Sequence, residues 1–351
     1  MSITSEFLIL DCQDSHLVHR NILKCWTRYI GSNMWGHVVK RLIQAPLILL
    51  IVSAAIFAIT RATPGDPIQI MLGSQTSPDA VAALRSVFRL DEPLHIQFFF
   101  WLGDLLRGDF GNSIRLNIPV LELLSERLPI SLTLAGSAMF FAFIVSIPLG
   151  IIAAIKRNTW IDYLATGYTL LGFAIPNFAL AIVLIYIFSI QLGWFPITGI
   201  GSSSNVGEGV WGMVRPYVLP AVALGTLQTA VFTRLLRSSM IDVLTQDYIR
   251  TAHAKGLRPS TILIIHALRN AMIPFVTMAA IQFAYLIGAQ VTIEYTFAIP
   301  GMGSAILSAV VNRDFPVVQG FVIIVAIFFL IANIVADILY SVIDPRIRHE
   351  S

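Results

Sequence analysis

Six long tracts without a charged residue constrain this chain more than any other feature. The shortest holds 18 residues, and the longest holds 45, of which only the part up to about residue 190 is continuously apolar. A helix needs roughly 20 apolar residues to cross about 30 Å of hydrocarbon. The tracts therefore predict an all-α polytopic membrane protein with six transmembrane helices. They cover residues 42–60, 128–155, 163–207, 216–233, 270–293 and 315–336.

The overall composition agrees with these tracts. Apolar residues make up 56% of the chain and charged residues only 12%, with a mean hydropathy of +0.78. A soluble domain carries about 25% charged residues. The composition therefore excludes a water-soluble globular protein.

The basic residues indicate how the chain crosses the membrane. With a cytoplasmic N-terminus, six spans return the C-terminus to the cytoplasm, and the inside segments then hold 15 of the 23 Lys and Arg residues. Six of the other eight lie in one long outside loop, between Arg61 and Arg127. This distribution follows the positive-inside rule, which gives long loops little weight. The basic residues thus report topology and give no reason to expect a nucleic-acid partner.

Four segments follow from this topology. Residues 1–33 form a cytoplasmic extension or result from a start codon placed too early, and both readings stay open. Residues 34–127 hold the first span and the long periplasmic loop, 128–341 the core of five helices with a cytoplasmic loop at 234–269, and 342–351 a cytoplasmic tail. Cys12, His16, His19 and Cys25 fit none of the usual zinc-ligand spacings. We therefore expect no metal site there.

Three features of the apolar segments predict local structure. Pro176 near the middle of the third span removes a backbone hydrogen bond and predicts a kink. Ala280, Ala284 and Gly288 place small residues at four-residue spacing, which favours close helix approach. In the long outside loop, Phe98 and Trp101 belong to an apolar face at helical spacing. That face fits a helix at the outer membrane interface better than a docking surface for an extracytoplasmic partner.

The chain lacks the residues that would energise transport or catalyse a reaction. No ionisable residue lies deep in the first five predicted spans, although a proton- or sodium-coupled carrier needs such groups. There is no GxxxxGK[ST], HExxH or GxSxG motif. These absences argue against a self-sufficient secondary carrier or channel and against a membrane-embedded enzyme. If the protein moves a solute uphill, another subunit must supply the energy.

The stretch from Asp247 to Pro259 is the most polar inside segment. Residues from Arg250 to Lys255 predict a short helix, with Gly256 as its C-terminal cap. A new helix is predicted to begin at Pro259. The residues alone leave two readings open: a helix that docks a partner, or a solvated amphipathic linker.

This stretch resembles the cytoplasmic coupling motif of bacterial ABC importer permeases, which reads EAA, three residues, Gly, nine residues and I-x-L-P. Ala252, Gly256 and Leu268 match that consensus. The departures resemble the form of the dipeptide and oligopeptide branch, RTAxAKG followed by HALRNAxxP, here residues 250–256 and 266–274.

The resemblance extends over residues 34–346 and is strongest to the B-type permease of that branch. Single motifs are weak, but their order along the chain is specific. They are PGDP at 64–67, LDEPL at 90–94, GDFG at 108–111, RLP at 127–129, IPGMG at 299–303 and RDFP at 313–316.

The resemblance implies an ABC importer type I permease fold in the bacterial inner membrane, surrounded by lipid. It also implies four kinds of partner: a second, C-type permease, two ATP-binding subunits, a periplasmic solute-binding protein and the cargo. This chain would bind no cofactor, because ATP and Mg would lie on the partner subunits. The residues that would couple it to the ATPases are Arg250, Thr251, Ala252, Lys255, Gly256 and Leu268.

The resemblance favours di- or oligopeptides as cargo, delivered by the binding protein. Glutathione, nickel chelates or another small solute remain alternatives within the same architecture. Asn177, Gln282 and Gln290 are candidate pathway residues, because they are polar and uncharged at membrane depth. Interhelical hydrogen bonding is the slightly favoured role for these side chains.

Overall fold

The computed structural model describes residues 41, 43–62, 91–198 and 209–343. Within these ranges the chain is mostly helical and forms no strand, which confirms the predicted all-α fold. The extension 1–33 with Cys12 and Cys25, the segment 63–90 and the end of the chain from residue 344 lie outside the described residues.

Among the described residues, five helices are long and apolar enough to cross a membrane, and a bent pair of helices supplies a sixth candidate span. The first is the helix Ile43–Ala62. The others are α6 (Val120–Ile155), α9 (Gly209–Leu244), the continuous run of α11 (Pro259–Thr261), η3 (Ile262–Leu268) and α12 (Arg269–Ala289), and α15 (Phe315–Ile343). The bent pair is α7 (Trp160–Ala174) with α8 (Asn177–Leu184) and its π-helical extension η1 (Ile185–Gln191).

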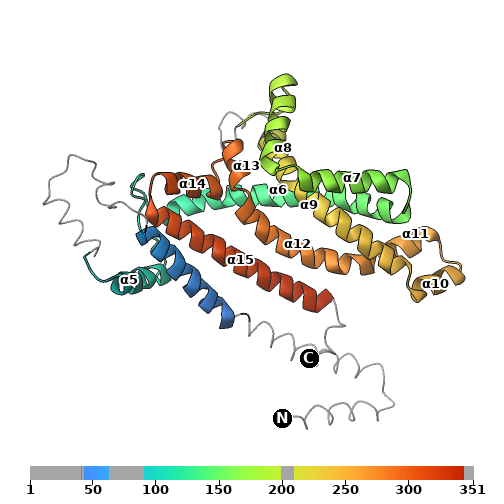
Figure 1. Cartoon of the computed structure of the whole chain (residues 1–351), viewed down its shortest axis with the longest axis horizontal. Helices are drawn as coiled ribbons and strands as arrows, with labels where there is room; N and C mark the ends of the chain where they lie inside the picture. The colour runs from blue at the N-terminus through green and yellow to red at the C-terminus, as the bar shows by residue number, and fades with distance from the viewer. Residues whose placement is uncertain (1–40, 42, 63–90, 199–208, 344–351) are drawn as a thin grey trace, which may run out of the picture.

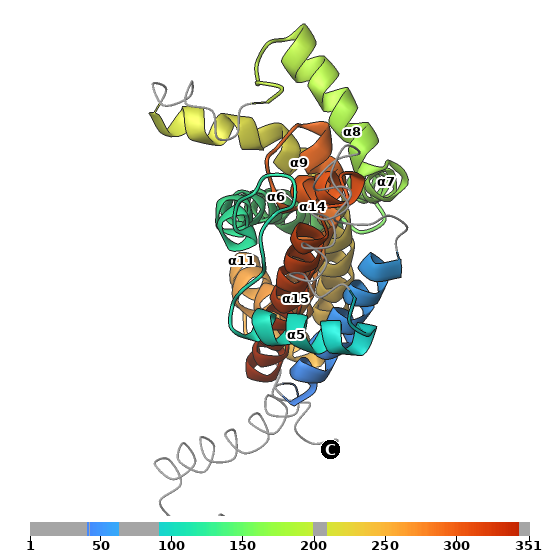
Figure 2. The same cartoon turned by 90° about the vertical axis from the view of Figure 1, so that its left-hand side faces the viewer.

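The third predicted span is broken rather than kinked. α7 and α8 meet at an angle of 103°. Ile175 adopts an extended conformation (φ −90°, ψ 119°), which is the conformation that a following proline imposes, and Pro176 also lacks the N–H that would continue the helix. As a result α8 leaves the bundle almost at a right angle (Figure 2).

α9 is the central helix of the bundle. It packs against α6, α7, α8 and α12, while α15 packs on α12 (Figure 1). Four short helices complete the part of the fold that the structure describes: α5 (Leu94–Leu106), α10 (Asp247–Ala254), α13 (Val291–Thr296) and α14 (Met302–Val311). α10 and α14 lie at opposite ends of the bundle, which we call the α10 end and the α14 end.

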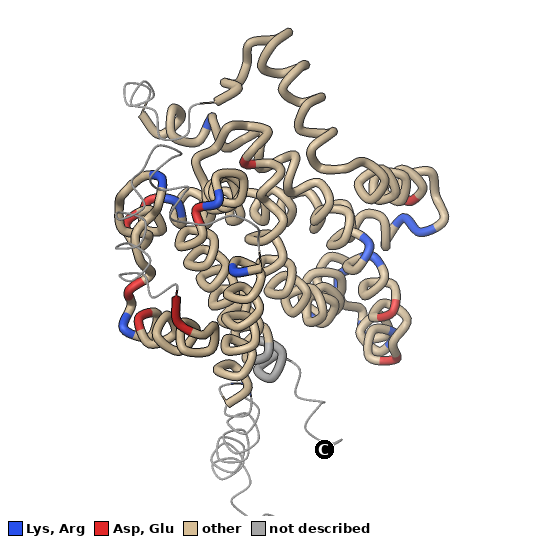
Figure 3. The backbone as a smooth tube through the Cα atoms, turned by 60° about the vertical axis from the view of Figure 1, so that its left-hand side comes forward, with Lys and Arg blue, Asp and Glu red and all other residues tan. Residues whose placement is uncertain are grey.

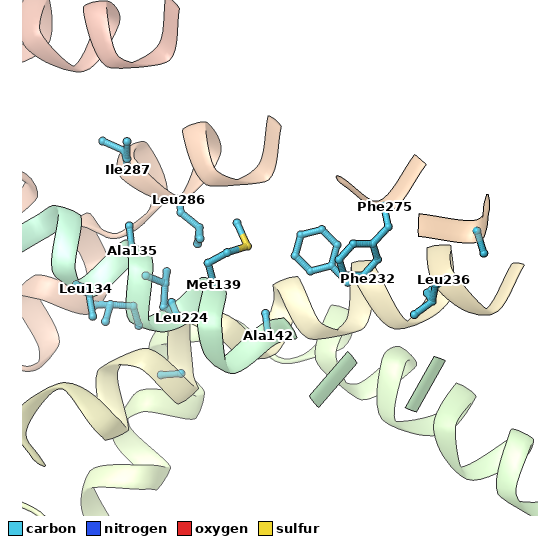
Figure 4. Packing of buried hydrophobic residues seen from close by; sticks show 14 of the residues in the cluster. Leu134, Ala135, Met139, Ala142, Leu224, Phe232, Leu236, Phe275, Leu286 and Ile287 are labelled. Atoms are coloured by element: carbon cyan, nitrogen blue, oxygen red, sulfur yellow. The ribbon is translucent and has the colours of Figure 1, made fainter. Parts of the chain in front are cut away.

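Aromatic packing joins three of the long helices. The rings of Phe143 (α6), Phe232 (α9) and Phe275 (α12) contact each other with centroids 5.0–5.5 Å apart. Phe232 and Phe275 are fully buried, and leucines of α6 and α9 continue the same core (Figure 4). In a membrane this packing stabilises the fold through van der Waals contacts, because lipid tails are as apolar as these side chains.

Glycines lie where the helices cross most closely. A Cβ on Gly225 of α9 would lie 2.6 Å from the Ala138 carbonyl oxygen of α6, and one on Gly172 of α7 would lie 2.9 Å from the Ala230 Cβ of α9. Small residues at such positions let backbones approach in a membrane. The described residues do not make the predicted close approach at Gly288, because a Cβ there would meet nothing within 4 Å.

The aromatic face of α5 packs on the first spanning helix. Ring centroids of Phe98 and Trp101 lie 5.4 and 5.6 Å from that of the buried Phe57. The same spanning helix is joined to α15, because the Gln319 amide donates a 2.7 Å hydrogen bond to the Thr60 hydroxyl. Phe98 and Trp101 were predicted to face either the membrane interface or a docking partner. In the structure they pack against another helix of the same chain.

Candidate functional site

The short helix α10 lies in the stretch that the sequence singles out at 247–259. It begins at Asp247, three residues before the predicted start, and ends at Ala254. Ile249 and Ala252 are buried and pack into the main core, whereas the rest of the helix is exposed. α10 therefore has one face fixed to its own bundle and one face that is open to a partner.

The chain leaves α10 through a tight turn at Gly256. Gly256 has φ +72°, a left-handed conformation that glycine adopts without steric cost. Its N–H donates to the His253 carbonyl at 3.0 Å, and the Leu257 N–H donates to the Ala252 carbonyl at 3.3 Å. These two bonds define a Schellman turn. The predicted role of Gly256 as the helix cap is thus confirmed.

The residues after the turn belong to the next long helix rather than to a loop. Pro259 occupies its first turn, as predicted, and the π-helical segment η3 holds His266, Ala267 and Leu268. Leu268 is partly buried against the core, so it supports α10 from inside and does not lie on its open face. The Asn270 amide also donates a 2.9 Å hydrogen bond to the Tyr248 hydroxyl, which fastens α10 to α12.

Exposed charge gathers on the open face of α10. The Arg250 side chain is 76% exposed, and its only described ion pair is a 3.2 Å contact with the still more exposed Asp247 on the same helix. Lys255 and Arg258 are exposed as well, and Thr251 donates its hydroxyl hydrogen to the Asp247 carbonyl. Charged residues collect toward the ends of the bundle, whose middle is largely free of them (Figure 3). The α10 end can therefore offer cations to an acidic surface.

A buried ion pair near this end was missed by the sequence reasoning, which read Arg237 only as a marker of topology. The Nε and Nη2 atoms of Arg237 in α9, whose side chain is 30% exposed, donate to the two carboxylate oxygens of Asp162 in α7 at 2.6 and 2.8 Å. Asp162 also accepts a hydrogen bond from the Asn158 N–H, and its side chain is 4% exposed. The two partners are 75 residues apart, so no local pattern could have paired them.

The three candidate pathway residues occupy different settings. Asn177 is the partly buried first residue of α8, directly after the break, and Gln282 is partly buried on α12. Gln290 lies at the junction of α12 and α13 and is fully buried, and neither its Oε1 nor its Nε2 has a hydrogen-bond partner. The interhelical hydrogen bond favoured for Gln290 is therefore not formed within the described part of the chain.

Two buried acids at the α14 end also escaped the sequence reasoning. Asp314 accepts hydrogen bonds from the Ser113 hydroxyl and from the backbone N–H groups of Ile114 and Arg115, and so joins the GDFG and RDFP regions. Glu294 is the second acid and is fully buried. A cavity of about 330 Å³ lies nearby, and its lining includes Arg115, Arg127, Ser304 and Asp314. The described residues contain no group of three His, Cys, Asp or Glu that could hold a metal ion.

Comparison with known proteins gives two matching family profiles. Residues 146–349 match the family described as binding-protein-dependent transport system inner membrane component, and residues 34–135 match the N-terminal component of the same kind of system. Together they include α10, both buried acids and every candidate pathway residue.

Several curated proteins are similar over 90% of this chain and all of their own length. A glutathione transport system permease protein of Salmonella typhimurium is 38% identical over 317 residues. An oligopeptide transport system permease protein of Bacillus subtilis is 37% identical over 317 residues, and a probable peptide ABC transporter permease protein of Sinorhizobium fredii is 36% identical over 316 residues.

Proposed function

Because the chain belongs to the family of binding-protein-dependent transport system inner membrane components, we propose that it forms one half of the pathway of an ABC peptide importer. A C-type permease supplies the other half, and two ATPase subunits, which bind ATP and Mg, drive it from the cytoplasm. A periplasmic solute-binding protein delivers di- or oligopeptides. The chain is a multi-pass protein of the inner membrane.

The construction of α10 is the observation that carries this proposal. Its buried face holds Ile249 and Ala252 in the core, and the Tyr248–Asn270 hydrogen bond fastens it to α12. α10 also directly follows α9 in the chain, so a push on its open face reaches two long helices at once. Arg250 and Lys255 are exposed for pairing with acidic groups on an ATPase.

This role fixes the orientation of the molecule. The α10 end faces the cytoplasm, both termini lie on that side, and the α14 end faces the periplasm. The positive-inside distribution supports this assignment, since Lys156, Arg157 and the cations of α10 all belong to the cytoplasmic side.

An open face of α12 supports a second permease as neighbour. Ile281, Tyr285 and Gly288 follow one another at helical spacing, all three are exposed, and Gly288 has free space above its Cα. Small residues beside apolar ones are the pattern at which helices associate in membranes.

The cargo follows from the names of the relatives and from the neutral pathway candidates. Of the three relatives named above, two are named for peptides or oligopeptides and one for glutathione, itself a tripeptide, and other similar proteins are glutathione permeases as well. Asn177, Gln282 and Gln290 offer amides rather than charges, which suits cargo of variable side chains. Selectivity then rests mainly with the solute-binding protein. Identification of the compound that the purified binding protein retains decides between a range of peptides and glutathione.

The coupling role is tested with the reconstituted complex and two variants of α10. Ala252→Asp places a carboxylate in the buried face, and Gly256→Pro is incompatible with φ +72°. We expect both to lose transport and the ATP hydrolysis that the binding protein stimulates. Arg157→Glu, an exposed change on the turn between α6 and α7, is the control. Normal coupling in either α10 variant would contradict the proposal.

A further inference from the structure

The carboxylate of Glu294 joins three helices at the α14 end. Its Oε1 accepts a 2.6 Å hydrogen bond from the Ser131 hydroxyl of α6, and its Oε2 accepts one of 2.9 Å from the Ser304 N–H of α14. The Gly303 N–H donates to the same carboxylate. The Ser131 oxygen in turn accepts a 2.7 Å bond from the Met302 N–H. One acid and one hydroxyl thus bind the first three amides of α14 and tie that helix to α6.

The glycines of the IPGMG segment shape the chain around this carboxylate. A Cβ on Gly301 would overlap the carboxyl group of Glu294, and a Cβ on Gly303 would lie 2.7 Å from the Cα of Val291. The backbone closes the same loop, because the Ile299 N–H donates to the Glu294 carbonyl at 2.7 Å. The backbone and side-chain atoms of residues 294–304 therefore surround the Glu294 carboxylate closely.

The cluster also explains how an acid is retained in a buried position. Desolvation by burial raises the pKa of Glu294, while the Ser131 hydroxyl, the two backbone N–H groups and the charge of Arg127 oppose that rise. The N-terminus of a helix adds a favourable field for negative charge. A buried charged group that loses one of its partners is strongly destabilising. The presence of this acid therefore indicates that the link between α13, α14 and α6 is maintained.

We propose that Glu294 is a positioning residue that fastens the α13–α14 hairpin to α6, so that these elements move as one rigid body when the periplasmic end of the pathway opens. The proposal rests on the proposed transport function. The hairpin is joined to α12 through Gln290, whose side-chain amide has no hydrogen-bond partner among the described residues. The backbone is helical there, because the Gln290 N–H donates to the Leu286 carbonyl at 3.1 Å and the Glu294 N–H donates to the Gln290 carbonyl at 2.8 Å. The side-chain contact of Glu294 with Ser131 crosses to α6, and we expect it to persist when the pathway opens.

Distances between spin labels test the rigid body directly. Leu121→Cys on α6 and Val311→Cys on α14 are exposed positions, introduced after Cys12→Ser and Cys25→Ser. Labels are measured in the complete complex in a lipid bilayer, without nucleotide and after trapping with ATP and vanadate. We expect the same distance distribution in both states, and a broadened, state-dependent one in Glu294→Ala. A wild-type distance that shifts between the states, or an unchanged Glu294→Ala distribution, would overturn the proposal.

A second measurement separates positioning from a general loss of stability. Glu294→Ala and Ser131→Ala should each raise the ATP hydrolysed per solute transported several-fold. The effect of the double variant should be smaller than the sum of the two single effects, because both variants lose the Ser131–Glu294 contact. Glu122→Ala, an exposed acid on α6, is the control. A lower yield of complex with an unchanged ratio overturns the proposal. If a binding protein does not stimulate ATP hydrolysis by the wild-type complex, the proposed function fails. The label distances still test whether Glu294 fastens the α13–α14 hairpin to α6.

Discussion

The α10 end and the α14 end use the same kind of turn for opposite purposes. α10, α13 and α14 all finish in a Schellman turn, with Gly256, Ala298 and Arg313 in the left-handed conformation. At the α10 end the charged side chains around the turn are exposed. At the α14 end Glu294 and Asp314 are buried and bound by donors of the same chain.

This difference indicates which end needs an external partner. Exposed charges are available to another protein, whereas a buried acid with several donors is already satisfied. The α10 end therefore suits the partner binding proposed for it, and the buried acids of the α14 end hold its own elements together. Four predictions test this division, in order of decreasing effect on stability.

Arg237→Ala should have the largest effect. Arg237 lies near the α10 end, so a large loss of stability would show that this end contains a structural charge besides its exposed ones. Loss of Arg237 leaves Asp162 buried without its bidentate partner, which costs about 3–5 kcal/mol of unfolding free energy. Arg250→Ala, the control, should change it by less than about 0.5 kcal/mol. Unfolding in detergent measures both. Equal losses of unfolding free energy in the two variants would show that the buried ion pair does not make Arg237 more important for stability than Arg250.

Gly301→Ala should rank second, because the new methyl group overlaps the Glu294 carboxylate. Overpacking of this kind costs about 1–3 kcal/mol. Gly288→Ala on α12 meets nothing within 4 Å and should be neutral or stabilise the isolated subunit by up to about 1 kcal/mol. The same unfolding measurement compares them, and an equally tolerated Gly301→Ala would argue against the tight enclosure of Glu294.

A reciprocal exchange at the turns should give effects of opposite sign. Gly256→Ala places a side chain at φ +72° and should destabilise by about 1 kcal/mol, although the space around it is open. Ala298→Gly relieves the same strain at φ 50° and should stabilise by about 0.5–1 kcal/mol after the added chain entropy is counted. Melting temperatures of the two variants measure the difference. A loss in both would mean that neighbouring contacts, rather than backbone conformation, decide the residue at these turns.

Arg250→Glu should have the smallest effect on stability and a large effect on activity. The side chain is exposed, so the unfolding free energy should change by less than about 0.5 kcal/mol. ATP hydrolysis by the reconstituted complex should nevertheless fall several-fold, because the variant repels an acidic partner. Arg157→Glu serves again as the control. Unchanged ATP hydrolysis in Arg250→Glu would show that Arg250 does not take part in coupling to the ATPase.

Features that depend on neighbouring residues were predictable from the sequence. The apolar tracts located the spans, Pro259 marked a helix start, and Gly256 marked a helix end. The sequence predicted that Pro176 disturbs the helix but not how large the bend is. A proline predicts a disturbed helix, but the 103° bend also depends on whether the following helix finds neighbours in the bundle.

Hydropathy and turn chemistry act over a few residues, so the order of the amino acids was sufficient to predict a polytopic α-helical permease and the position of the exposed helix α10. Which charges are buried and paired depends instead on the three-dimensional packing. Ser131 and Glu294 are 163 residues apart, and Arg237 and Asp162 are 75 apart. Their contact depends on which faces of the helices meet, and uniformly apolar helices carry little periodicity that would reveal those faces.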